Sequence, residues 1–200
     1  GRVRRAVDEA ITNAVNAGGK ITLQFGAGSS SDYVRLVNTT LVANVATVTL
    51  TNIAQTYSSI RLIAHLKGTS ANAVETLSVT VNGDTSAIYD IQELKGTAST
   101  ASSTESFAQA AFNNNSISCG GGLAGVFTSV DVLFSDYRNT AFNRDSLWRV
   151  ARKDSTSTGG LIYKESAGYY RSVNAITSLE FSLSGGNFTN GCVFSVYGIN

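Results

Sequence analysis

The stretch LSVTVNGDTSAIY, residues 77–89, contains the clearest local signal in the chain. Apolar and small polar side chains alternate before Asn82-Gly83, and a period of two is typical of a β-strand with one buried face. Asn and Gly both tolerate a positive φ, which a tight two-residue turn requires. We therefore predict two antiparallel strands, at residues 75–82 and 86–94, joined as a hairpin at this turn.

The same alternation recurs along the chain, for example in ATVTLT at residues 46–51. Further strands are predicted at 60–67, 126–134, 161–164, 176–184 and 192–199. Three stretches rich in Gly, Ser, Thr or Asn are predicted to be surface loops: 96–106, 113–122 and 153–160. Many short strands without intervening helices favour an all-β fold, an antiparallel β-sandwich of jelly-roll-like form.

The last predicted strand has no clearly polar face. Cys192, Phe194 and Val196 would share one face, and Val193, Ser195, Tyr197 and Ile199 the other. A strand that is apolar on both faces needs cover on both sides. We expect the second sheet to cover one face, and the N-terminal helix, a loop or a neighbouring subunit to cover the other.

Residues 3–17 have the pattern of an amphipathic helix, because apolar side chains recur three and four positions apart before Gly18-Gly19. The predicted apolar stripe includes Val3, Val7, Ala10, Ile11, Ala14 and Val15. Several copies could associate along this stripe as a short bundle, or the helix could lie against its own domain. The expected organisation is a helical anchor at residues 1–19 and a β-sandwich domain at residues 20–200.

The charge balance excludes some partners. Only 14% of the residues are charged, against about 25% in a typical chain, and the net charge is +1. This balance gives no electrostatic reason to expect a nucleic acid or an anionic membrane as a partner. Cys119 and Cys192 lie outside any CxxC spacing, so no metal site is expected. They are interpreted as two buried free thiols, with a disulfide as the alternative.

The residue types needed for catalysis are sparse. His65, the single histidine, lies in RLIAHLK, where alternation places it on the outward side of a strand. No Ser or Cys lies in a nucleophile-elbow context, and GGGLAG at residues 120–125 lacks the GK[ST] of a phosphate-binding loop. Six carboxylates are candidates for a hydrolytic pair by residue type alone: Asp84, Asp90, Asp131, Asp136, Asp145 and Asp154. We predict that the chain is not an enzyme and needs no cofactor.

Residues 135–171 interleave arginines with aromatic side chains, a composition that suits stacking on sugars or bases, or a protein interface. The candidates are Tyr137, Arg138, Arg144, Trp148, Arg149, Arg152, Tyr163, Tyr169, Tyr170 and Arg171. Nearby acidic residues offset the positive charge and weaken the nucleic-acid interpretation. The alternative is that Trp148 is core and the arginines are solvated. If the segment is functional, we favour protein–protein contact.

Three stretches together resemble a known domain. IAQTYSSIRLIAHL (53–66), VNGDTSAIY (81–89) and AITSLEFSLSGGNFTNGCVFSVYGI (175–199) resemble successive signatures of a β-sandwich domain found in tailed-bacteriophage virion proteins. The resemblance covers most of residues 40–200 in order. Ala54 stands where that domain usually has Pro, Cys192 where it has Ser, and Val196 where it has Leu. The resemblance carries over no catalytic residue.

The resemblance implies a non-enzymatic structural role in a virion assembled in the bacterial cytoplasm, as a head-decoration or tail-fibre module. The expected partners are further copies of the chain, as a homotrimer, and other virion proteins such as the major capsid or tail protein. The alternative is an adhesin module that grips a host-surface glycan through exposed Trp148 or Tyr170.

Overall fold

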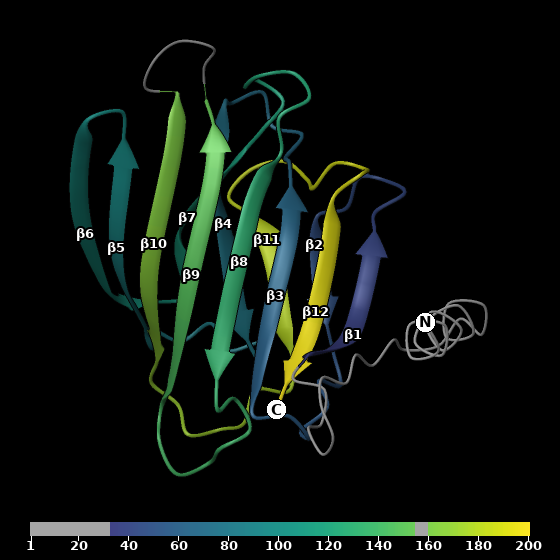
Figure 1. Cartoon of the computed structure of the whole chain (residues 1–200), viewed down its shortest axis with the longest axis vertical. Coiled ribbons are helices and arrows are strands. Elements are labelled where there is room, and N and C mark those ends of the chain that lie inside the picture. Colours follow the sequence, from purple (N-terminus) through teal and green to yellow (C-terminus); the bar gives the residue numbers. More distant parts are fainter. Residues whose placement is uncertain (1–32, 155–159) are drawn as a thin grey trace, which may run out of the picture.

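The computed structural model describes residues 33–154 and 160–200, and all regular structure in them is β-strand. Twelve strands form two antiparallel sheets (Figure 1), which confirms the all-β prediction. In this part of the chain, no helix is long and apolar enough to cross a membrane. The predicted helix at residues 3–17, with its apolar stripe, lies outside the described residues.

The larger sheet has eight strands. Its spatial order is β1 (Tyr33–Thr40), β12 (Val193–Ile199), β3 (Ser59–Leu66), β8 (Thr128–Ser135), β9 (Arg144–Lys153), β10 (Leu161–Tyr170), β5 (Tyr89–Thr97) and β6 (Thr100–Gln109). The first and last strands of the described chain pair with each other, from Tyr33 opposite Ile199 to Thr40 opposite Val193. The C-terminal strand is therefore an interior strand, with β1 on one side and β3 on the other.

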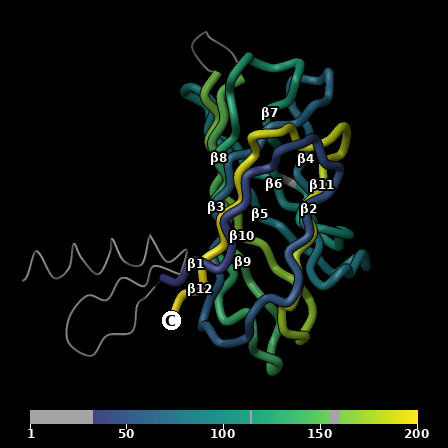
Figure 2. Tube along the Cα trace, turned by 90° about the vertical axis from the view of Figure 1, so that its right-hand side faces the viewer, coloured from purple at the N-terminus to yellow at the C-terminus, as the bar shows by residue number. Residues whose placement is uncertain are grey.

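The smaller sheet has four strands and packs against one face of the larger sheet, as the side view in Figure 2 shows. Its order is β2 (Thr47–Leu50), β11 (Leu179–Leu183), β4 (Val74–Val81) and β7 (Phe112–Ser118). The four strands of the smaller sheet are too few to cover all eight strands of the larger sheet. The side chains at positions 100–105 of β6 are accordingly exposed on both faces of the larger sheet.

Aromatic side chains join the two layers. Trp148 of β9 is almost fully buried, and its ring centroid lies 5.4 Å from that of Phe112 in β7. Phe194 of β12 makes an edge-on contact at 5.6 Å with Phe181 of β11. Burying one such side chain stabilises the fold by roughly 1.5–3 kcal/mol. These contacts, made across the gap between the sheets, hold the larger sheet on the smaller one.

The turn at Asn82-Gly83 is present, but the predicted hairpin is wrong. Both residues have a positive φ, of 54° and 69°, and the Asp84 amide donates to Val81 O at 2.9 Å. However, β4 and β5 belong to different sheets. The Tyr89 hydroxyl donates to Asp84 O at 2.7 Å and accepts from the Val81 amide at 2.9 Å. Tyr89 thus holds the segment after the turn in place, at the point where the chain crosses from the smaller sheet to the larger one.

The faces predicted for the last strand are confirmed. Cys192, Phe194 and Val196 are buried between the sheets, whereas Tyr197 and Ile199 on the other face are half-buried. The Tyr197 ring makes an edge-on contact with Tyr33 of β1, at 6.3 Å between centroids. The second face of this strand is therefore partly covered within the chain and partly open.

Two of the predicted surface loops are wrong, since residues 96–106 overlap the β5–β6 hairpin and residues 113–122 overlap β7. Polar groups of the larger sheet hydrogen-bond to part of strand β7, which helps to accommodate its polar sequence. Arg152 donates to Ser116 Oγ at 2.9 Å, and the Ser118 amide donates to Thr128 Oγ1 at 2.8 Å. Strands β1 and β9 were not predicted, and most of the third predicted loop, 153–160, lies outside the described residues.

Both cysteines are buried free thiols, as interpreted from the sequence. The Cys192 thiol lies 3.2 Å from the Lys67 amide and 3.3 Å from Lys67 O. Burial raises the pKa of the Cys119 thiol, so it stays protonated at neutral pH. The disulfide alternative is not realised in this structure.

Candidate binding face on the larger sheet

The smaller sheet covers one side of the larger sheet and leaves the opposite side, the outer face, open. Strand alternation places on this face Arg35, Arg61, Ile63, His65, Ser129, Asp131, Leu133, Asp145, Leu147, Arg149, Ala151, Lys153, Tyr163, Glu165 and Tyr169, with Leu94, Tyr33, Tyr197, Ile199 and Leu161 around them. Antiparallel sheets with one solvated face usually carry polar residues there. This face departs from that rule.

Exposed apolar side chains gather on the outer face. Among the described residues, seven of the eleven exposed large hydrophobic side chains lie on it: Tyr33, Ile63, Leu94, Leu147, Leu161, Tyr163 and Tyr169. A concentration of exposed apolar side chains on one face of a folded protein favours a site of interaction there. The outer face is therefore the strongest candidate for a functional surface in the described chain.

Charged side chains form a ladder across the middle of this face. Asp131 of β8, Arg149 of β9 and Glu165 of β10 are direct cross-strand partners. Arg149 Nε donates to Glu165 Oε1 at 3.1 Å. The carboxylate of Glu165 raises the pKa of Arg149 above its ordinary value through this hydrogen bond. The ladder alternates in sign, so opposite charges lie side by side.

Arg61 of β3 joins the other end of the ladder. Its Nε and Nη2 atoms donate to the two carboxylate oxygens of Asp131 at 2.7 and 2.6 Å, and its Nη1 atom lies 3.3 Å from the Tyr33 hydroxyl. The pKa of Arg61 is raised above its ordinary value, mainly by the hydrogen bonds to Asp131. A two-point pair of this kind fixes both side chains in one geometry.

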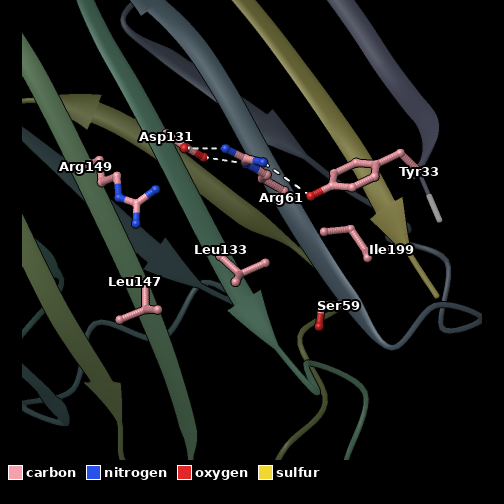
Figure 3. A pocket seen from close by; sticks show the side chains of 8 residues that line it. All are labelled: Tyr33, Ser59, Arg61, Asp131, Leu133, Leu147, Arg149 and Ile199. Carbon is pink, nitrogen blue, oxygen red and sulfur yellow. Dashed lines mark hydrogen bonds and ion pairs between the residues drawn. The ribbon is translucent and has the colours of Figure 1, made fainter.

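Three adjoining hollows follow the ladder. The first, of about 340 Å³, lies between Tyr33, Arg61, Leu133 and Leu147, and the Arg149 side chain reaches toward it (Figure 3). The second, also of about 340 Å³, shares Arg61 and Arg149 with the first. A third, of about 450 Å³, lies around Leu94 and shares Tyr163 with the second. Together they suit an extended or ridged partner that offers apolar contact.

The outer face also holds His65 and Ser129, with Nε2 and Oγ 3.4 Å apart. The outward position predicted for His65 is confirmed. Within the described residues, no carboxylate hydrogen-bonds to His65, so the group that orients the histidine in a hydrolytic triad is not shown. No cluster of three metal-ligating side chains occurs in the described part of the chain either. The absence of enzyme activity remains a prediction.

The structure divides the Arg and aromatic candidates of residues 135–171 into three groups. Five are buried: Tyr137, Arg144, Trp148, Arg152 and Tyr170. Three lie on the outer face: Arg149, Tyr163 and Tyr169. Arg138 is exposed in the loop after β8, and Arg171 stacks on Phe107 of β6, 4.5 Å from the ring centroid.

The buried candidates have structural partners. Trp148 Nε1 donates to Ser146 Oγ at 2.8 Å, and Arg152 donates to both carboxylate oxygens of Asp154 at 2.7 and 2.9 Å. Arg144 donates to the backbone oxygens of Phe142 and Val173. Trp148 and Tyr170 cannot stack on a glycan in this fold, which corrects the expectation that either is exposed.

Sequence reasoning missed the centre of the face. Arg61, Leu133 and Leu147 were not singled out, and Asp131 was a candidate by type alone. Arg61 and Asp131 are seventy positions apart, and they meet only because β3 pairs with β8. The available signal was the alternation in RLIAHLK, which predicts that Arg61, Ile63 and His65 share an outward face.

No protein-family model and no curated protein matches the sequence. Among solved structures, a scytalido-glutamic peptidase with a transition-state analogue inhibitor aligns with 80% of this chain at 12% identity and a TM-score of 0.25. The alignment covers 66% of the peptidase chain, so this chain spans less than two thirds of its length. A likeness this low carries no argument about activity.

Proposed function

We propose that this chain is a non-enzymatic structural module of a tailed-phage virion, exposed as a head-decoration or tail-fibre component. In this proposal it is a jelly-roll-like β-sandwich that assembles as a homotrimer and contacts other virion proteins through the outer face. The observation that carries the proposal is the concentration of exposed apolar side chains on that one face.

The chemistry of the face suits a protein partner. The charges at its centre pair with one another, Arg61 with Asp131 and Arg149 with Glu165. A partner that docks on this centre would therefore not leave an unpaired charge there, which is the costly outcome at a desolvated interface. Leu147 and Tyr163 offer apolar and aromatic contact on either side of the ladder, and such side chains dominate the energetics of protein interfaces.

The virion assignment rests on the sequence resemblance, whose signature stretches form central strands. IAQTYSSIRLIAHL runs into β3, and the terminal signature contains β11 and β12. Within the latter, Phe188 is fully buried and bridges to Val45 and Gly68. These motifs therefore build the two layers and the edge that joins them, which supports a shared fold as the reason for the resemblance.

The test is association with purified phage particles. Leu147→Asp places a charge at the centre of the face, on a side chain that is 57% exposed, so we expect the fold to persist and association to be lost. Val42→Asp is the matched control, because Val42 is 94% exposed and lies in the loop after β1. Equal association of both variants would count against the outer face, and no association of the wild type would count against the virion role.

A glycan-binding adhesin remains the second candidate, and exposed Tyr163 and Tyr169 on β10 favour it. They are 46% and 44% exposed on the same face as Arg149 and Glu165, so aromatic platforms lie beside hydrogen-bonding groups. A glycan array with Tyr163→Ala and Tyr169→Ala separates the candidates. Sugar binding that both variants lose while they still associate with particles would favour the adhesin.

A further inference from the structure

Strand β6 ends the larger sheet with an unpaired edge. It is ten residues long, and within the described chain it is hydrogen-bonded to β5 alone. Positions 100–105 are exposed on both faces, so neither sheet nor loop covers this part of the strand. An open strand edge presents a row of free N–H and C=O groups that can pair with another strand.

The other edges of the two sheets are protected in ways that residues 100–106 of β6 are not. The pairing of β1 is interrupted by a bulge between Arg35 and Val37, and β2 has only four residues. Strand β7 lies against β5 and β9 of the larger sheet. In β6 the pairing with β5 is regular from Thr100 to Ser106, the sequence TASSTES has no Pro or Lys, and Glu105 is the one charged residue.

The β5–β6 hairpin determines which backbone N–H and C=O groups of β6 point toward the open edge. Thr97 and Thr100 flank a two-residue turn, so they form a hydrogen-bonded pair. Hydrogen-bonded and non-hydrogen-bonded pairs alternate along an antiparallel ladder. The backbone groups of Thr100, Ser102, Thr104 and Ser106 therefore face β5. Those of Ala101, Ser103 and Glu105 face the open edge.

We infer that β6 pairs antiparallel with β6 of a second copy of this chain, about a two-fold axis at Ser103. In this register Ser103 lies opposite Ser103 of the second copy, and Ala101 lies opposite Glu105 of the second copy. Each residue whose N–H and C=O groups point outward then lies opposite another such residue of the second copy. An antiparallel ladder requires this match. The inference does not depend on the proposed virion role.

The charges and side chains of the strand agree with this register. The two Glu105 carboxylates lie opposite Ala101 and about 14 Å from each other along the strands, so no like charges face each other. The other side chains between them are small: Ala101, Ser102, Ser103 and Thr104. Ser and Thr hydroxyls on paired strands hydrogen-bond across the ladder. A second copy is therefore the partner that this edge fits.

Cysteine cross-linking of the full chain tests the register. Ser103→Cys brings two Cα atoms to about 5.5 Å, within the range of about 4.4–6.8 Å for a disulfide, and we expect a shift to a disulfide-linked dimer under mild oxidation. Ala101→Cys is the matched control, because it lies on the same exposed strand face but about 14 Å from its own counterpart. We expect no disulfide-linked dimer from this variant, and the native cysteines are buried and should not contribute.

A second arm keeps the register falsifiable. A mixture of Ala101→Cys and Glu105→Cys chains should yield the mixed dimer, identified by mass spectrometry of the linked peptides. An Ala101→Cys dimer that forms as readily as the Ser103→Cys dimer would indicate random collision and overturn the inference. A Ser103→Cys chain that forms no disulfide-linked dimer at tens of micromolar would overturn it as well.

Discussion

Arg61 and Asp131, on neighbouring strands, form a two-point ion pair with donor–acceptor distances of 2.7 and 2.6 Å. The side chains are 31% and 27% exposed, at the centre of the outer face. The pair links the first hollow to the charge ladder, since both residues line the first and second hollows. It therefore belongs to the binding face as well as to the stability of the sheet.

Asp131→Asn should lower the free energy of unfolding by only about 0.5–1 kcal/mol, because both partners keep some access to water. Urea denaturation measures this change in unfolding free energy. Glu165→Gln is the control, since its pair with Arg149 is 49% and 59% exposed and should matter less. A loss of several kcal/mol in Asp131→Asn would mean that the pair is a buried structural element and not part of an accessible face.

Trp148→Ala should destabilise the fold by about 3–5 kcal/mol, because it removes a buried ring and leaves a cavity. The neighbouring Leu147→Ala should change the free energy of unfolding by less than about 0.5 kcal/mol, since Leu147 points outward and is 57% exposed. Thermal denaturation compares the two. A Trp148→Ala protein as stable as the wild type would contradict the placement of this ring in the core.

These two adjacent residues show what the sequence could predict. Alternation predicts which side chains share a face of one strand, and it was correct for Phe194 and Val196 in the last strand. In residues 135–171 the composition alone left open whether Trp148 belongs to a binding surface or to the core. Because the side chains of β9 and β10 point alternately to the two faces, Trp148 and Tyr170 lie inside and Tyr163 lies outside.

Strand partners were harder to predict than strand faces. The local chemistry of Asn82-Gly83 predicted the turn, but the choice between pairing back and crossing to the other layer depends on contacts made by Tyr89. The Arg61–Asp131 pair likewise depends on the pairing of β3 with β8. Such long-range pairings are selected by the packing of the whole fold, and periodicity within a segment carries no information on them.

Gly198→Ala should destabilise the chain by about 1–3 kcal/mol through overpacking. A Cβ atom at this position would lie 2.4 Å from Cγ of Tyr57, too close for either to remain in place. Gly96→Ala, in β5, is the control, because its nearest neighbour would be 3.9 Å away. The double variant Tyr57→Ala, Gly198→Ala tests the cause. If its loss of unfolding free energy equals the sum of the two single losses, the clash with Tyr57 is not the cause.

The stability of the chain should depend on Glu75 at acid pH. Hydrogen bonds from Ser184, Ser70 and Asn72 lower the pKa of the Glu75 carboxyl below its ordinary value of 4.5. A lowered pKa in the folded state contributes stability above pH 4.5, and that stability is lost as the pH falls through the folded-state value.

Glu75→Gln should therefore be less stable than the wild type at neutral pH, and the difference should narrow below pH 4.5. Denaturation across a pH series measures the difference in unfolding free energy. Ser184→Ala, which removes the strongest of the three hydrogen bonds by its effect on the pKa, should show the same narrowing to a smaller extent. A difference that stays constant from neutral to acid pH would contradict this assignment.

Tyrosine labelling of the free and the assembled protein tests the central claim, that the outer face is covered by a partner. In the free chain Tyr163 and Tyr169, 46% and 44% exposed, should label readily, while buried Tyr137 and Tyr170 should not. In the oligomer or on the particle, we predict that Tyr163 and Tyr169 become protected. Equal labelling of both tyrosines in the free and the assembled states would contradict the account.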